Sequence, residues 1–200
     1  MRGRRAVILG LGGAAAAFAF TLGLGAWRVR NRPSANAVLP LPLDKMAWQL
    51  GDHRGRTVQP SDWIGRPALV FFGFTWCPDV CPTTLSDISG WLEDLGTDAD
   101  RLTVALISVD PERDTPEVLE SYLANFDPQI IGLVGPADQI TRVAADFRVT
   151  YRRVPRDDGD YTMDHTAGVF LLYADERFAS IIDFHEDRRF AIPKIRRILA

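Results

Sequence analysis

The sequence predicts an α/β domain in which a mixed β-sheet is flanked by helices on both faces. Short apolar runs of strand length alternate along the chain with segments in which apolar residues recur every three or four positions. Near the C-terminus, two such runs flank a polar turn at residues 175–177, as expected for an antiparallel hairpin. Alternating strands and helices that end in a hairpin give parallel and antiparallel pairs in one sheet.

The individual elements follow from the same pattern. A hairpin is expected at residues 47–58, with its turn at 52–55, and a buried strand at 67–74. Thr115 and Pro116 are a typical helix start. Four residues spaced by three or four positions predict a helix after the buried strand: Leu85, Ile88, Leu92 and Leu95. The other expected elements are strands at 102–109, 130–134, 149–154, 168–173 and 178–184, a helix around 140–147 and a helix at 192–199 with Pro193 in its first turn.

Composition limits the class of protein. A chain of 200 residues, 46% hydrophobic and 24% charged, suits one soluble domain and excludes a disordered chain and a polytopic membrane protein. Residues 1–37 hold six of the 23 basic side chains and no acidic one, so the rest carries 17 basic against 26 acidic side chains. This part of the chain is therefore net negative. Because a negatively charged surface repels phosphate backbones, no nucleic-acid partner is expected.

The N-terminal segment predicts a membrane anchor. Residues 6–27 are apolar except for Thr21 and have three arginines on either side, and about 20 apolar residues cross a bilayer as a helix. A cleaved signal peptide is the alternative, because residues 35–37 have the small-x-small form of a cleavage site. We expect a single transmembrane anchor at residues 1–30, an extended linker at 31–46 and the folded domain at 47–200.

The expected location is the bacterial cytoplasmic membrane, with the C-terminal domain in the periplasm. The flanking arginines are balanced, and the α-amino group favours a cytoplasmic N-terminus. The periplasm is oxidising, so two cysteines there either form a disulfide or are kept reduced for a purpose.

The two cysteines lie where a buried strand runs into a helix. Cys81 follows Cys77 by four residues, about one helical turn, so both sulfurs can face the same side. The positive end of the helix dipole favours a thiolate there. Two thiolates at this spacing can close a disulfide or bind one soft metal ion. A cysteine pair in this position, preceded by Trp76, is typical of a thioredoxin-like domain.

One of the three histidines is placed to join the cysteines. His53, in a polar turn, and His185, beside two acidic residues, are expected at the surface. His165 precedes the strand at 168–173, and in a thioredoxin-like topology that loop approaches the cysteines. Two thiolates and an imidazole suit copper in either oxidation state. A structural zinc site would use four protein ligands, and only three are found here.

Other polar residues near this set have open interpretations. Asp164 or Asp79 could orient His165 by a hydrogen bond, and Met163 could add a thioether ligand or pack in the core. The charged residues 110–114 could line the site, meet a partner or form a solvated loop.

Three segments resemble the signature of the Sco/SenC family of copper proteins. They are GFTWCPDVCPTTL at 73–85, ISVDPERDTP at 107–116 and YTMDHTA at 161–167, and the similarity runs from about residue 47 to the end. The resemblance implies a membrane-tethered thioredoxin-like domain that binds one copper ion, Cu(I) or Cu(II), through Cys77, Cys81 and His165. Trp76 departs from the family, which often has histidine there, and this puts the redox tuning of Cys77 in question.

The resemblance also implies a metallochaperone. Family members help to assemble the dinuclear copper centre (CuA) of cytochrome c oxidase subunit II, by delivering copper, by reducing its cysteines, or both. The implied partners are subunit II or a similar copper acceptor, a periplasmic copper donor and a thiol reductant. The alternative is a membrane-anchored thiol-disulfide oxidoreductase without an obligatory copper role, in which Cys77 attacks a partner disulfide and Cys81 resolves the intermediate. Whether the protein is an enzyme in this sense stays open.

Overall fold

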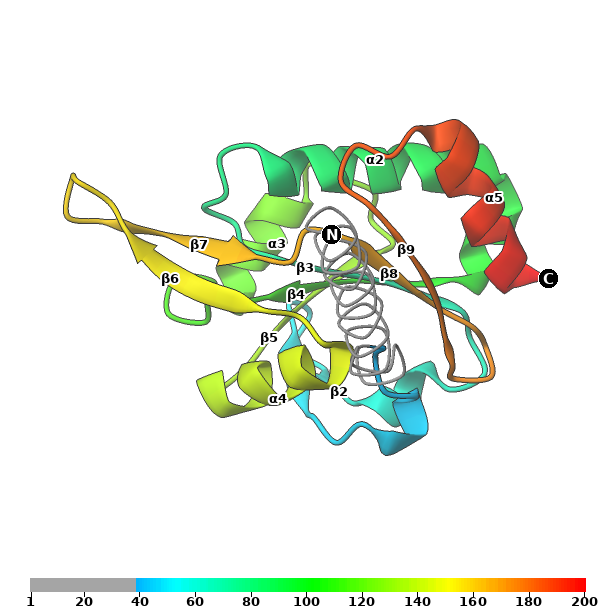
Figure 1. Ribbon diagram of the computed structural model, residues 1–200, viewed down its shortest axis with the longest axis horizontal. Coiled ribbons are helices and arrows are strands. Elements are labelled where there is room, and N and C mark those ends of the chain that lie inside the picture. Colours follow the sequence, from blue (N-terminus) through cyan, green and yellow to red (C-terminus); the bar gives the residue numbers. More distant parts are fainter. Residues whose placement is uncertain (1–38) are drawn as a thin grey trace, which may run out of the picture. The chain divides into compact units, whose positions relative to one another are not determined.

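The computed structural model describes residues 39–200, so the predicted anchor at residues 1–30 lies outside the described part (Figure 1). Within residues 39–200, no helix is both long enough and apolar enough to span a membrane.

A mixed sheet forms the centre of this domain, as predicted. Its strand order is β2-β1-β5-β4-β3-β8-β9. The pairs β3–β4 and β4–β5 are parallel, and the other pairs are antiparallel. The strands are β1 (Leu50–Asp52), β2 (Thr57–Val58), β3 (Ala68–Gly73), β4 (Thr103–Ser108), β5 (Ile130–Val134), β8 (Val169–Leu172) and β9 (Phe178–Ile182).

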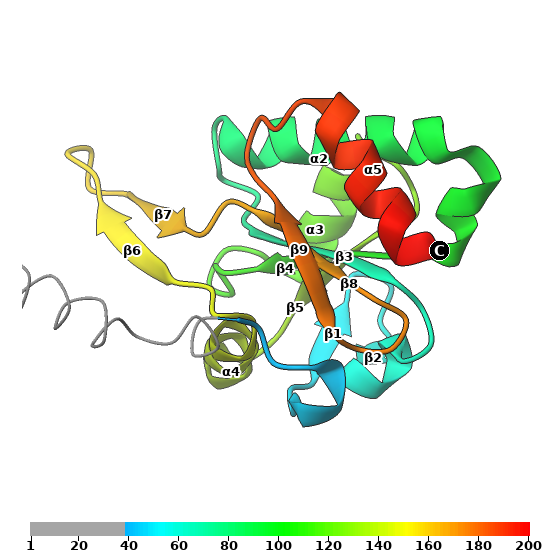
Figure 2. The same cartoon turned by 45° about the vertical axis from the view of Figure 1, so that its right-hand side comes forward.

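Helices cover both faces of the sheet. Figures 1 and 2 show α2, α3 and α5 on one face and α4 on the other. The α-helices of residues 39–200 are α2 (Val80–Leu95), α3 (Pro116–Leu123), α4 (Ala137–Phe147) and α5 (Arg188–Leu199). Because both faces are covered, all six residues of β3 are buried, which explains their continuous apolar sequence.

Aromatic side chains pack between the sheet and α4. Phe72 of β3 lies edge-to-face against Phe147 of α4 and Phe170 of β8, with ring centroids 5.4 and 5.9 Å apart. On the opposite face, Gly132 of β5 leaves space that Leu123 of α3 fills. The central strands therefore contribute to two separate apolar layers, one on each side of the sheet.

A second, two-stranded sheet projects from the domain (Figure 1). It consists of β6 (Tyr151–Pro155) and β7 (Tyr161–His165), which pair in antiparallel fashion. The sequence predicts a strand at 149–154 but a loop around His165, and the loop prediction is wrong because His165 ends β7. Most residues of both strands are partly or fully exposed, so β7 lacks the buried face that gives a strand its apolar alternation.

Three predicted boundaries also differ from the structure. The linker predicted to reach residue 46 ends earlier, because Leu43 is buried in the core and Leu41 donates a backbone hydrogen bond to Asp146. The first hairpin begins at Leu50 rather than residue 47. Helix α5 begins at Arg188, capped by the Asp187 side chain, which places Pro193 inside the helix rather than in its first turn.

Candidate metal centre

The two cysteines lie at the junction between β3 and α2, as predicted. Cys81 is the second residue of α2 and is fully buried, whereas Cys77 is half-buried in the loop before the helix. Both are free thiols. The backbone N–H of Cys81 donates to Cys77 Sγ at 3.4 Å, so an amide of the first helical turn faces the Cys77 sulfur.

Gly73 allows the close approach of Cys81 to the sheet. A Cβ atom at this position would lie 3.1 Å from Cys81 Sγ and 2.9 Å from the Phe71 ring. A side chain at the end of β3 would therefore push the Cys81 sulfur away from its present position.

Strand β7 brings His165 to Cys81. The Nε2 atom of His165 lies 3.5 Å from Cys81 Sγ, and Nδ1 lies 2.9 Å from the carbonyl oxygen of Thr166. Since a carbonyl only accepts, Nδ1 carries the proton in the neutral ring and the Nε2 lone pair faces the sulfur. The rings of Phe71 and Phe74 pack edge-to-face with the imidazole, at 6.1 and 5.8 Å between centroids.

The residue that orients His165 is not one that sequence reasoning suggested. Asp164 points to Arg152 instead, with 2.8 Å between Oδ2 and Nη2. The hydrogen bond that fixes the imidazole tautomer goes to the Thr166 backbone carbonyl, which no sequence pattern reveals.

The separation of 3.5 Å between Cys81 Sγ and His165 Nε2 suits two ligands of one metal ion. Metal–sulfur and metal–nitrogen bonds of about 2.3 and 2.0 Å would subtend roughly 110° across this distance. Across residues 39–200, no group of three or more His, Cys, Asp and Glu side chains is already arranged to hold a metal ion. The half-buried Cys77 already lies within interaction distance of Cys81 and His165, so small movements of these side chains would complete a three-ligand site.

The two thiols differ in acidity. A hydrogen bond from the Cys81 side chain is the main cause that lowers the pKa of Cys77 to about 4; burial opposes it, and the neighbouring His165 and nearby backbone amides add to it. Hydrogen bonding to Cys77, together with burial, raises the pKa of Cys81 above its ordinary value. At neutral pH the reduced site holds a thiolate at Cys77 and a buried thiol at Cys81, and Cys81 must lose its proton when a metal binds.

Iodoacetamide is expected to modify Cys77 before Cys81 in the reduced, metal-free protein, at a rate that hardly changes between about pH 6 and about pH 8. A thiol with the ordinary pKa of 9.0 would react about tenfold faster for each added pH unit, because its thiolate fraction grows tenfold. As the pH falls toward the native pKa of about 4, Cys77 is protonated, and both the reactivity and the stabilisation of the folded state by the thiolate are lost.

Mass spectrometry of the modified peptides measures the two rates separately. Urea-unfolded protein is the control, in which both cysteines should show the ordinary pH dependence. A Cys77 rate in the folded protein that rises tenfold per pH unit would contradict the depressed pKa.

The other two histidines lie apart from this site; His185 is at the surface, as predicted, but His53 is half-buried. His53 Nδ1 accepts a hydrogen bond from the Gly132 backbone N–H at 2.9 Å. This bond connects the turn that follows β1 with strand β5. His185 is exposed in a turn with φ of 59°.

Sequence reasoning assigned no role to Tyr161, which helps to position β7, the strand that carries His165. Tyr161, the first residue of β7, is buried and donates from its hydroxyl to Asp110 at 2.8 Å. Asp110 and Asp114 are themselves only 2% and 1% exposed, so residues 110–114 are not the solvated loop that one interpretation expects. An aromatic residue in a polar strand is the only signal that could have pointed to Tyr161.

The comparisons with known proteins identify the family. A family model described as SCO1/SenC matches residues 42–200. The chain belongs to the SCO1/SenC family. The family's solved structures also confirm the thioredoxin-like domain predicted from the sequence.

Relatives come from bacteria and mitochondria. The bovine mitochondrial SCO2 homolog is 36% identical over 76% of this chain and 59% of its own length. The SCO2-like protein RP587 of Rickettsia prowazekii is 39% identical over 66% of this chain and 65% of its own length. The chain thus spans less than two thirds of each of these relatives.

Solved relatives with copper bound include a bacterial and a yeast protein. Bradyrhizobium japonicum ScoI with copper bound is 43% identical, with a TM-score of 0.72 over 80% of this chain and 99% of that one. Yeast Sco1 with copper bound is 30% identical, with a TM-score of 0.70 over 80% of this chain and 87% of that one.

Proposed function

We propose that the protein binds one copper ion through Cys77, Cys81 and His165 and delivers it during assembly of the CuA centre of cytochrome c oxidase subunit II. The observation that carries the proposal is the 3.5 Å contact between Cys81 Sγ and His165 Nε2. It joins a thiol and an imidazole from distant parts of the chain, in a family with copper-bound members. Sulfur favours Cu(I), and imidazole also accepts Cu(II).

The arrangement suits a cargo that is passed on. Cys81 is fully buried and forms the inner side of the site, whereas Cys77 and His165 are both half-buried and form its outer side. Ligands of an acceptor can therefore reach the ion from the Cys77 side before the protein releases it. A disulfide between the two cysteines would remove both sulfur ligands, so oxidation would switch copper binding off.

The proposed setting is the periplasmic face of a bacterial cytoplasmic membrane. The apolar segment at residues 6–27 supports an anchor there. The acceptor would be subunit II or a similar copper protein, and the copper would come from a periplasmic donor. A thiol reductant is required as well, because an oxidising compartment converts the dithiol to a disulfide and two electrons must restore it.

Reduction of the acceptor's cysteines is a second candidate role, favoured by the low pKa of Cys77. The Cys77 thiolate would attack an acceptor disulfide to form a mixed disulfide, and Cys81 would then displace it. The acceptor gains two thiols, and the protein is left with a Cys77–Cys81 disulfide.

Copper binding by the reduced full chain tests the proposal. One equivalent of Cu(II) is expected to remain bound after gel filtration and to give a thiolate-to-copper charge-transfer band, and His165→Asn is expected to lose most of both. The matched control is His185→Asn, which changes an exposed histidine outside the site and should behave like the unmodified protein. Metal analysis and absorption spectra provide the measurements. A chain that retains no copper, or a His165→Asn variant that binds normally, would overturn the proposal.

A further inference from the structure

We propose that residues 110–114 connect the two halves of the copper site and that Arg113 is a positioning residue that keeps His165 against the cysteines. The inference rests on the proposed copper-binding function and assigns a role to a charged segment that this function does not use directly. The two halves are the cysteine half, residues 73–81, and the histidine half, the β6–β7 hairpin.

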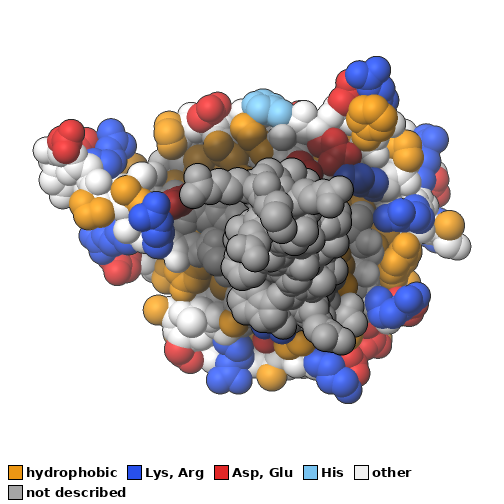
Figure 3. Space-filling view, viewed as in Figure 1, with side chains coloured by type: hydrophobic (Ala, Val, Ile, Leu, Met, Phe, Trp, Pro, Cys, Tyr) orange, Lys and Arg blue, Asp and Glu red, His pale blue; other side chains and the backbone are white. Residues whose placement is uncertain are grey.

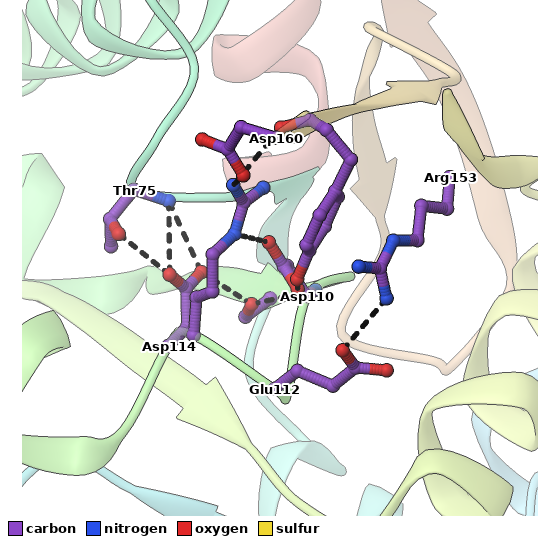
Figure 4. Close-up of polar contacts among 9 residues, drawn as sticks. Thr75, Asp110, Glu112, Asp114, Arg153 and Asp160 are labelled. Atoms are coloured by element: carbon purple, nitrogen blue, oxygen red, sulfur yellow. Dashed lines mark hydrogen bonds and ion pairs between the residues drawn. The ribbon is translucent and has the colours of Figure 1, made fainter. Parts of the chain in front are cut away.

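Asp114 holds the cysteine half. Its carboxylate accepts a hydrogen bond from Thr75 Oγ1 at 2.6 Å, one from the Thr75 backbone N–H at 3.1 Å and one from Ser108 Oγ at 2.6 Å (Figure 4). Thr75 lies two residues before Cys77. A buried acceptor with three donors thus fixes the loop that carries the outer thiol.

Asp110 holds the histidine half. One carboxylate oxygen accepts from the Tyr161 hydroxyl at 2.8 Å, and the other accepts from Arg113 Nε at 2.6 Å. Arg113 Nη1 also donates to the backbone carbonyl of Tyr161 at 3.0 Å. Tyr161 begins β7 and His165 ends it, and a strand advances roughly 3.4 Å per residue. The anchoring of Tyr161 therefore sets the direction from which His165 reaches Cys81.

Arg113 contacts both halves. Its guanidinium carbon lies 3.6 Å from the centroid of the Tyr161 ring, whose other face is covered by Arg153 at 3.5 Å. The same guanidinium lies 5.5 Å from the ring of Trp76, the residue before Cys77. Arg153 in turn donates to Glu112 at 2.9 Å (Figure 4). No other side chain described in residues 39–200 stacks on rings from both the cysteine loop and the hairpin.

The hairpin depends on these contacts because, apart from the packing of Tyr151 and Met163 against the core, it has few others. In the described part of the chain, its strands pair only with each other, and an isolated two-stranded hairpin is at best marginally stable. Apart from the contacts of His165 itself, its side-chain hydrogen bonds to the rest of residues 39–200 are one between Tyr151 and Thr141 and those to residues 110–114. Figure 3 shows acidic and basic side chains side by side on the projecting hairpin. The hairpin therefore has no patch of one charge sign that could hold it to the domain by long-range attraction.

Loss of the Arg113 guanidinium would loosen the hairpin and leave both sulfur ligands in place. Cu(II) uses the imidazole, so its affinity should fall, whereas the two thiolates should still hold Cu(I). Residues that orient a metal ligand typically change affinity by about 10- to 100-fold when removed. We expect the lower end of this range for Cu(II), because three other contacts of the hairpin remain.

The test uses Arg113→Met in the full chain, with and without His165→Asn. The dissociation constants for Cu(II) and Cu(I) are measured by competition with chelators. We expect about tenfold weaker Cu(II) binding, little change for Cu(I), and no effect of Arg113→Met once His165 is absent. The matched control is Arg156→Met on the same hairpin, whose guanidinium pairs with Asp158 and makes no hydrogen bond to residues 110–114. This control should bind Cu(II) normally.

A metal-free readout separates this inference from the proposed function. In the unloaded protein, the imidazole NMR signals of His165 should shift and broaden in Arg113→Met but not in Arg156→Met. Tyr161→Phe keeps the ring and removes only the hydroxyl bond to Asp110, so it replaces Arg113→Met if that variant does not fold. Unchanged His165 signals and Cu(II) affinity in the folded variant, or a loss of Cu(II) affinity that persists without His165, would overturn the inference. Failure of the unmodified chain to bind copper would overturn the proposed function instead.

Discussion

Cys81→Ser is expected to abolish tight copper binding while leaving the domain folded. Cys81 is fully buried, and its sulfur lies beside the His165 imidazole and the Cys77 loop, so it is the central member of the set. A serine hydroxyl stays protonated at neutral pH and lacks the softness that Cu(I) requires. It is slightly smaller than the thiol and can still donate a hydrogen bond to His165 Nε2. Metal analysis after gel filtration of the reduced full chain with one equivalent of Cu(I) measures the loss.

Thr84→Val provides the control for this substitution. Thr84 is also buried on α2, about one turn beyond Cys81, and its hydroxyl donates to the Val80 carbonyl. This variant should keep one copper per chain. If Cys81→Ser also kept one copper per chain, with an unchanged absorption spectrum, the metal would have to lie elsewhere.

Asp114→Ala is expected to lower the free energy of unfolding by about 3 kcal/mol or more, since each buried donor left without an acceptor costs about 1–3 kcal/mol. The side chain is buried, and three donors from Thr75 and Ser108 would lose their partner. The loop before Cys77 would loosen with them, so copper affinity should fall together with stability. Urea unfolding followed by circular dichroism measures the change.

Two further variants show whether the hydrogen bonds are responsible. Asp114→Asn keeps the size of the side chain and one acceptor oxygen, so it should lose less stability than alanine. Asp98→Ala removes an exposed carboxylate whose only ion pair within residues 39–200 is a 3.7 Å contact to Arg101, and it should change stability by about 0.5 kcal/mol or less. Equal stability of Asp114→Ala and Asp98→Ala would contradict the role of Asp114.

Much of the central sheet was predictable because its strands are covered on both faces. A strand buried on both sides needs continuous apolar sequence, and the run at 67–74 accordingly contains β3 (Ala68–Gly73). The start of α3 was predictable for a local reason: Thr115 precedes Pro116, and its hydroxyl accepts from the Val118 backbone N–H. Such signals depend only on neighbours in the chain.

Of the β6–β7 hairpin, the sequence predicts β6 but not β7, because β7 is not covered on both faces. β7 carries polar residues on an exposed strand, so no apolar period marks it. Its position depends on Tyr161 and Arg113 meeting across 48 residues of sequence. No local pattern reports a contact of this kind.

The chemistry of the candidate site could be read from a short stretch of sequence: two cysteines about one helical turn apart at the end of a buried strand, in an arrangement that favours a thiolate or a soft metal. Which atoms meet there depends on the folded chain. His165 lies 84 residues after Cys81, and the hairpin brings its Nε2 to 3.5 Å from the sulfur. The same folding buries Asp110 and Asp114, which the sequence presents as part of a charged loop. Residue type sets what a side chain can bind, but burial and partners follow from the packing of distant segments.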